Sequence, residues 1–106
     1  MLGTIAQAVF LSIVLCAGAL AADPPTISQK GKTFSPDQVE IAVGGSVIID
    51  NDDRTIHHVY IESSEFNFDS GEQVPGHKVR ITFPKTGTFE VKCDIHPKML
   101  LRVVVK

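Results

Sequence analysis

The chain has few cysteines and no excess of positive charge, and each of these facts excludes a class of protein. Its two cysteines are Cys16 and Cys93. If the apolar start of the chain is removed on export, Cys93 remains alone and no internal disulfide can form, although exported proteins usually use cysteine in disulfides. Ten basic and twelve acidic residues give a net charge of −2. A nucleic-acid-binding protein would show a basic excess, so we expect no nucleic-acid partner.

Charged side chains are absent from residues 1–21, MLGTIAQAVFLSIVLCAGALA. The segment ends in Ala19-Leu20-Ala21, a pattern typical of a signal-peptide cleavage site, and the helix-breaking Asp23-Pro24-Pro25 follows. It lacks the usual Lys or Arg near its start, and its length approaches a bilayer span, so an uncleaved anchor is the alternative. The N-terminal position and the Ala-x-Ala end favour a signal peptide over residues 1–21. We then expect one domain over residues 22–106, a periplasmic location and no stable membrane association after cleavage.

Helical periodicity, internal repeats and low-complexity linkers are absent after the first segment. Short runs of alternating apolar and polar residues, separated by turn residues, indicate β-strands instead. The clearest runs cover residues 38–43, 78–83, 88–93 and 101–105. Residues 62–77 are the least regular part and predict one short strand between loops. About seven or eight strands in this length indicate an all-β fold, an antiparallel Greek-key β-sandwich of two packed sheets.

A cluster of soft ligands lies near the end of the chain, in Cys93-Asp-Ile-His96-Pro-Lys-Met99. A thiolate, an imidazole and a thioether suit copper better than magnesium or calcium. One more histidine would complete the trigonal His₂Cys set with a weak axial Met that defines a blue-copper electron-transfer site, and His57-His58 offers it upstream. A bound metal would also protect a thiol that is unpaired in an oxidising compartment.

Strand parity selects between the two upstream histidines, because side chains alternate between the faces of a strand. In residues 88–93 the two charged side chains mark the solvent face, so Cys93 points inward. In residues 56–62 the final glutamate shares its face with His58, so His57 points inward. Two inward ligands from different strands can meet at one end of the sandwich, where the loop after Cys93 closes over them. The predicted ligands of one copper ion are therefore His57, Cys93, His96 and Met99.

Asn51 six residues before His57, together with Thr-Gly-Thr-Phe-Glu-Val-Lys-Cys-Asp-Ile-His-Pro-Lys-Met at residues 86–99, resembles the cupredoxin family. The similarity is greatest to its amicyanin-like group, which is related to plastocyanin and pseudoazurin, and it runs from about residue 34 to residue 106. The resemblance implies a type 1 copper site with two histidines and the cysteine in the trigonal plane and Met99 as axial ligand. It also implies outer-sphere transfer of single electrons between larger redox proteins. The family usually has Asn after the first ligand histidine, tying the two ligand loops together, whereas this chain has His58.

We therefore expect a small exported blue copper protein that shuttles single electrons and is a monomer. Transient redox protein partners should dock near His96, Pro97 and Leu100. A copper carrier or chaperone is the alternative, although carriers usually expose Met- or His-rich clusters. An enzyme is not expected, because the copper enzymes related to cupredoxins bind further copper through additional histidines, and His58 and His77 are too few and badly spaced.

Overall fold

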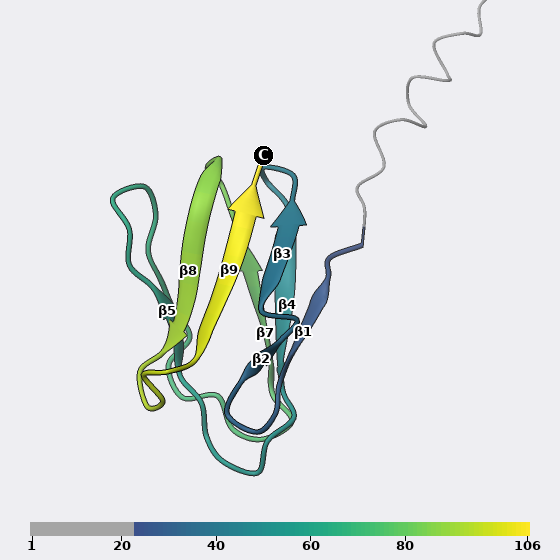
Figure 1. Ribbon diagram of the computed structural model, residues 1–106, viewed down its shortest axis with the longest axis vertical. Helices are drawn as coiled ribbons and strands as arrows, with labels where there is room; N and C mark the ends of the chain where they lie inside the picture. The colour runs from purple at the N-terminus through teal and green to yellow at the C-terminus, as the bar shows by residue number, and fades with distance from the viewer. Residues whose placement is uncertain (1–22) are drawn as a thin grey trace, which may run out of the picture.

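The computed structural model describes residues 23–106, which form two β-sheets packed face to face (Figure 1). This part of the chain contains nine strands and no helix, so no helix in it is long and apolar enough to span a membrane. In chain order the strands are β1 (Thr26–Gln29), β2 (Phe34–Ser35), β3 (Gln38–Ile41), β4 (Ser46–Asn51), β5 (Val59–Ile61), β6 (Phe68–Asp69), β7 (Lys78–Thr82), β8 (Gly87–Cys93) and β9 (Leu100–Val105). The predicted all-β sandwich is confirmed, with nine strands where seven or eight were expected. The predicted signal peptide and its boundary lie outside the described residues.

The two sheets have the strand orders β2-β1-β4-β7 and β3-β9-β8-β5-β6. Most neighbours are antiparallel, as expected, but β1 pairs with β4 and β3 pairs with β9 in parallel. The expectation of a purely antiparallel sandwich was therefore wrong at these two pairs. Alternation of apolar and polar residues reports which face of a strand is buried and is the same in both directions, so it could not reveal the parallel pairs.

The core lies between the sheets and is made by the inward positions of the long strands. Along β8 the inward side chains, Phe89, Val91 and Cys93, are all buried, and the residues between them are exposed. Strands β4, β7 and β9 alternate in the same way. The alternation predicted for the segments that form β7, β8 and β9 is thus confirmed. The side chains that form the core are Ile27, Phe34, Val47, Ile49, Val59, Ile61, Val79, Ile81, Phe83, Phe89, Val91, Cys93, Met99, Leu101, Val103 and Val105.

One predicted strand position is wrong. The alternating run at residues 38–43 was expected to be a strand throughout, but β3 ends at Ile41 and Val43 is 49% exposed. The chain turns there because Gly44 takes a φ of +83°, a conformation that glycine adopts without steric cost. The Gly44 N–H donates to the Phe83 carbonyl of the neighbouring segment, which fixes the turn.

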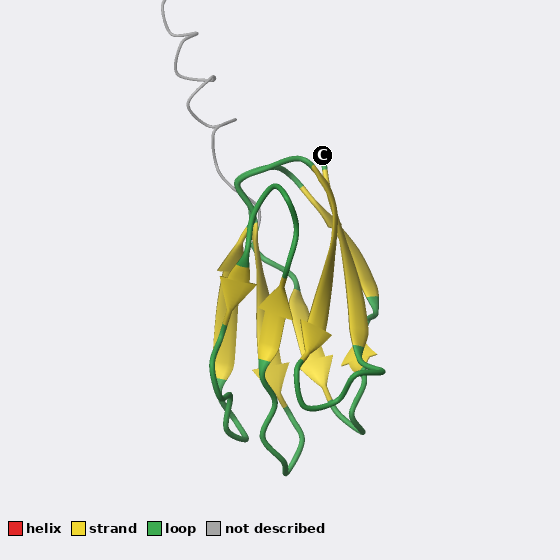
Figure 2. Cartoon of the chain, turned by 90° about the vertical axis from the view of Figure 1, so that its left-hand side faces the viewer, coloured by secondary structure: helices red, strands yellow, loops and turns green. Residues whose placement is uncertain are grey.

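The strand directions bring four loops to one end of the sandwich. Strands β4 and β8 end where β5, β7 and β9 begin, and β1, parallel to β4, ends there too. The loops at this end are residues 30–33, 52–58, 70–77 and 94–99. They project together beyond the strands at the lower end of the molecule (Figure 2). The predicted ligands fall in, or next to, two of these loops.

Candidate metal centre

Three of the four predicted ligands meet at this end of the sandwich. One donor atom from each of His57, Cys93 and His96 lies within 4.8 Å of the other two. The Sγ atom of Cys93 is 3.7 Å from His57 Nδ1 and 3.6 Å from His96 Nδ1. The two imidazole rings pack edge to face, with centroids 4.9 Å apart and an interplanar angle of 61°. Both rings therefore present the same nitrogen toward one point beside the thiol.

This donor set fits a small soft ion. A nitrogen at about 2.0 Å and a sulfur at about 2.3 Å from a shared ion, separated by an angle of about 120°, are about 3.7 Å apart. The observed separations of 3.6 and 3.7 Å match that spacing. Two imidazoles and one thiolate with a nearby thioether are the ligands of blue-copper sites. The arrangement supports one copper ion.

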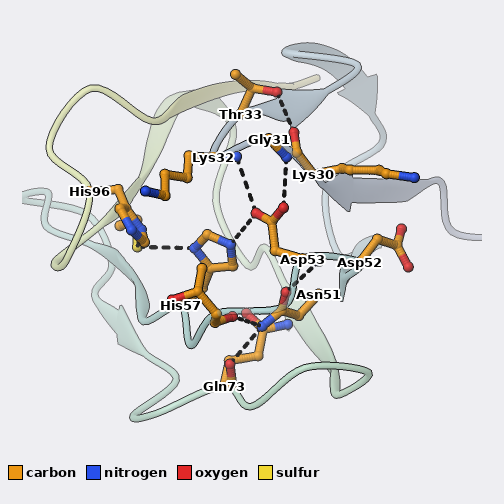
Figure 3. Close-up of polar contacts among 12 residues, drawn as sticks. Lys30, Gly31, Lys32, Thr33, Asn51, Asp52, Asp53, His57, Gln73 and His96 are labelled. Carbon is orange, nitrogen blue, oxygen red and sulfur yellow. Dashed lines mark hydrogen bonds and ion pairs between the residues drawn. The ribbon is translucent and has the colours of Figure 1, made fainter.

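His57 is held from both its backbone and its ring. Its N–H donates to the Gln73 carbonyl at 3.0 Å, and its own carbonyl accepts from Gln73 N–H at 2.7 Å. Buried Asn51 steadies the same loop, because its side-chain amide donates to the carbonyls of Gln73 and Thr55. The His57 ring is fully buried, and its Nε2 lies 2.7 Å from a carboxylate oxygen of Asp53 (Figure 3). The inward orientation predicted for His57 is confirmed.

Asp53 fixes the tautomer of His57. Its carboxylate also accepts the backbone N–H groups of Gly31 and Lys32, at 2.7 and 3.1 Å. Burial opposes ionisation, but these hydrogen bonds and the one from His57 outweigh it and hold the pKa of Asp53 below 3.8. An ionised carboxylate only accepts, so His57 must donate through Nε2–H, which leaves the Nδ1 lone pair facing Cys93. Such a carboxylate contact orients a ligand histidine and raises its basicity.

Cys93 is the last residue of β8 and is 1% exposed. The backbone N–H of His58 points at its Sγ, at 3.4 Å, and would stabilise negative charge on the sulfur. The His58 carbonyl in turn accepts the Asp94 N–H at 2.9 Å. The backbone of one residue thus ties the first histidine loop to the cysteine loop.

The His58 ring has a different role from the asparagine that the family usually places there. It turns away from the cysteine loop, and its Nε2 lies 2.6 Å from the carboxylate of Asp69 on β6. Asp69 also accepts the Gly71 N–H; that bond first, and then His58, lowers the pKa of Asp69 below 3.8. The side chain of His58 therefore fastens the start of β5 to the edge strand, and the link between the ligand loops uses the backbone of His58 instead of its ring.

His96 and Met99 come from the loop between β8 and β9. The Met99 N–H donates to the His96 carbonyl at 3.0 Å, which closes the loop into a turn, and the Met99 side chain is 2% exposed. His96 is half-buried, so part of its ring reaches the surface. Desolvation is the largest cause of a lowered pKa of His96, and the ammonium group of Lys32 acts in the same direction. Met99 lines the same surface hollow as His96.

The surface around His96 is apolar. Ile95 is 49% exposed, Leu100 is 37% exposed and Pro97 is exposed between them. Ile95 and Pro97 line a hollow together with His96, and Leu100 lines the adjoining hollow. Apolar side chains are therefore exposed where a partner is expected to dock. His77 is exposed and lies outside the donor cluster.

Sequence reasoning missed two residues of this centre. Asp53 holds the His57 ring and Gln73 holds its backbone, and both contacts depend on loops that are far apart in the chain. The four-residue spacing from Asp53 to His57 was the only available signal, and in a segment without helix it indicates no particular contact.

The profile of the family described as cupredoxin-like domain matches residues 3–105. The chain belongs to the cupredoxin family. No curated protein matches this cupredoxin. The predicted resemblance is confirmed by the family match and by the donor cluster that the fold assembles.

Solved structures similar to this cupredoxin include several amicyanins. The reduced Cu(I) form of an amicyanin variant at pH 4 gives a TM-score of 0.72 at 22% identity, over 85% of this chain and 89% of that one. A purple cupredoxin from Nitrosopumilus maritimus gives 0.69 at 23% identity, over 77% and 99%. At these identities the likeness establishes the shared fold.

A copper-containing nitrite reductase from Thermus scotoductus SA-01 is also similar. Its TM-score is 0.73 at 29% identity, over 83% of this cupredoxin and 23% of the enzyme chain. The chain thus spans about a quarter of the length of that enzyme. A cupredoxin domain therefore occurs both alone and within a larger copper enzyme.

Proposed function

We propose that this cupredoxin is an exported blue copper protein that carries single electrons between redox partners. His57, Cys93 and His96 would bind one copper ion in a trigonal plane, with Met99 as the axial ligand. The observation that carries the proposal is the convergence of two imidazole nitrogens on the Cys93 thiol, within 4.8 Å of one another, at the loop end of a cupredoxin fold.

The residues around the donors suit fast electron transfer. With copper bound, the site accepts and releases one electron through the Cu(I)/Cu(II) couple. His57 is fixed by Asp53 and by its backbone bonds to Gln73, and Cys93 is fixed at the end of β8. Donors held in place by the protein move little when the charge changes, which keeps reorganisation small.

Electrons would enter and leave through His96. It is the one donor residue of the cluster that is only half-buried, whereas His57 and Cys93 are enclosed. The apolar side chains of Ile95, Pro97 and Leu100 around it would exclude water when a partner docks. Redox encounters of this kind are small and transient.

Export, monomeric state and partners are part of the proposal. An exported chain meets an oxidising compartment, where the single thiol of Cys93 would be protected as a buried ligand. Residues 1–21 would act as the cleaved signal, and the periplasm is the usual location of amicyanin-like cupredoxins. We propose redox proteins as the donor and acceptor.

A carrier that hands copper to other proteins fits the centre less well. Rapid metal exchange needs exposed donors, and His57, Cys93 and Met99 are each at most 2% exposed. Catalysis at a second copper is also less well supported. In residues 23–106 the other two histidines lie outside the cluster, His58 bonded to Asp69 and His77 exposed on a turn.

Cyclic voltammetry of the copper-loaded protein in the presence of bicinchoninate, a Cu(I) chelator, tests the proposal. An electron shuttle should give a reversible one-electron wave over many cycles and keep one copper per chain. Transfer of copper to the chelator on the first reduction would instead identify a carrier. A copper-loaded protein with no reversible wave would contradict the proposed electron transfer.

A further inference from the structure

The apolar surface around His96 is bordered by positive charge. A hollow of about 400 Å³ opens beside the ring and is lined by Lys32, Ile95, His96, Pro97, Lys98 and Met99. Both charged residues in this lining are lysines. Neither forms an ion pair within residues 23–106, whereas Lys78, Lys92 and Lys106 do. Two free ammonium groups therefore flank the apolar patch of a chain whose net charge is −2.

Lys32 is placed there by the loop between β1 and β2. The loop closes on itself through Lys30 N–H to the Thr33 carbonyl and Thr33 Oγ to the Lys30 carbonyl. Lys32 takes a φ of +57°, in the left-handed region that a lysine seldom adopts. Its backbone N–H is held by Asp53, and its side chain extends toward His96 (Figure 3). The same carboxylate thus positions one donor histidine and the lysine beside the other.

No acidic residue is among those that line this hollow. The carboxylate of Asp53 lies behind it, is 12% exposed and accepts hydrogen bonds from Gly31, Lys32 and His57. Asp52 accepts the hydroxyl of Ser28 and lines a neighbouring hollow, where three basic residues, Lys30, Lys32 and Arg54, accompany Asp52 and Asp53. Asp94 and Glu90 line an adjoining hollow that shares Pro97, Lys98 and Met99 with this one.

We infer that the redox partner that docks over His96 has an apolar contact surface ringed by carboxylates, and that Lys32 and Lys98 select it. The inference rests on the proposed electron transfer and adds the charge of the partner. Opposite charges around a small apolar contact raise the rate of encounter more than the affinity. A partner ringed by lysines would be repelled at the same place.

Charge reversal tests the inference. The variants are Lys32→Glu and Lys98→Glu, and Lys85→Glu is the matched control, because Lys85 is exposed in the turn between β7 and β8 at the opposite end of the sandwich. The reduced protein is mixed with hexacyanoferrate(III), which takes one electron and becomes hexacyanoferrate(II), or with the cationic tris(phenanthroline)cobalt(III), which becomes cobalt(II). Reduction potentials of all variants are measured so that rates are compared at equal driving force.

At low ionic strength the rate with hexacyanoferrate(III) should fall about three- to tenfold in Lys32→Glu and in Lys98→Glu, and the rate with the cobalt complex should rise. Both effects should vanish at high salt, and Lys85→Glu should stay within about twofold of wild type. Equal responses in all three variants would overturn the inference. Irreversible oxidation or reduction of the wild type would instead contradict the proposed electron transfer, whatever the charge of the partner.

A second measurement tests the partner directly. Electron exchange is followed with two cytochromes, one whose haem edge is ringed by carboxylates and one ringed by lysines. The wild type should favour the acidic cytochrome, and the two site variants should lose that preference while the Lys85 control keeps it. Binding of the wild type to phosphatidylglycerol vesicles is measured as well. If both site variants abolish this binding and leave the cytochrome preference unchanged, the lysines bind a membrane surface and the inference is overturned.

Discussion

The imidazole of His57 lies between two partners, with Nε2 2.7 Å from the Asp53 carboxylate and Nδ1 3.7 Å from the Cys93 sulfur. Each contact determines the role of one nitrogen. The carboxylate accepts the hydrogen bond from Nε2–H, and the other nitrogen is left free to bind a metal beside the thiolate. Asp53 also ties this histidine to the loop that carries Lys32, so one side chain organises both the interior and the surface of the centre.

Asp53→Asn should weaken the centre without unfolding it. The variant keeps the shape of the side chain but removes its charge, so His57 becomes a poorer donor. Copper affinity should fall about 10- to 100-fold, the usual effect of losing such a partner, and the reduction potential should rise. Competition with a chelator and voltammetry measure the two quantities. Asp52→Asn is the control, because Asp52 does not contact His57; equal shifts in both variants would contradict the assignment.

The two adjacent histidines should behave oppositely on substitution. His57→Ala removes a buried donor next to Cys93 and should abolish the intense visible band of the copper-loaded protein. His58→Ala removes a ring that contacts Asp69, so the band should persist at nearly its original intensity. Absorption spectra of both variants at equal copper content decide the matter. Loss of the band in His58→Ala with retention in His57→Ala would reverse the choice of ligand.

Asp69 should stabilise the fold in a pH-dependent way. Its pKa is lowered below 3.8 by Gly71 N–H and by His58, so the folded state favours the ionised carboxylate. That stabilisation is present above about pH 3.8 and is lost as the pH falls through the lowered value in the folded state. Urea unfolding of Asp69→Asn should therefore differ from wild type at pH 6 and converge with it toward pH 2. A difference that persists at pH 2 would show that the carboxylate charge is not the cause.

Two neighbouring leucines should differ in their contribution to stability. Leu101 is fully buried in the core, and Leu101→Ala should lower the free energy of unfolding by about 2–5 kcal/mol. Leu100 is 37% exposed beside His96, and Leu100→Ala should cost less than about 1 kcal/mol. Chemical denaturation gives both values. The same Leu100 variant should still slow electron transfer to a protein partner, because it removes part of the docking surface.

The fold and the donor set were largely accessible from the sequence, because both follow from local patterns. Alternation in residues 88–93 and 56–62 placed Cys93 and His57 inward, and the structure agrees. The spacing from Cys93 to Met99 indicated a single loop, and in the structure one loop does connect the end of β8 to the start of β9. Alternation failed at Val43, where the same pattern continued into a turn.

The features of the centre that the sequence did not predict depend on contacts between segments that are far apart in the chain. The parallel pairing of β1 with β4 brings the loop at residues 30–33 beside Asp53, and no local pattern reports which strands are neighbours. The role of Lys32 follows from that pairing and from a backbone conformation unusual for lysine. Strand parity placed His58 on the outward face, but it could not predict the contact of its ring with Asp69, eleven residues away in the chain.

The visible absorption spectrum of the Cu(II)-loaded protein, recorded before and after addition of ascorbate, tests the central claim most directly. Thiolate coordination by Cys93 within a His₂Cys plane predicts an intense blue absorption band that ascorbate bleaches and reoxidation restores. Cys93→Ser should lack the band at equal copper content. A weak spectrum in the wild type, or the same spectrum in wild type and Cys93→Ser, would contradict a blue-copper centre at these residues.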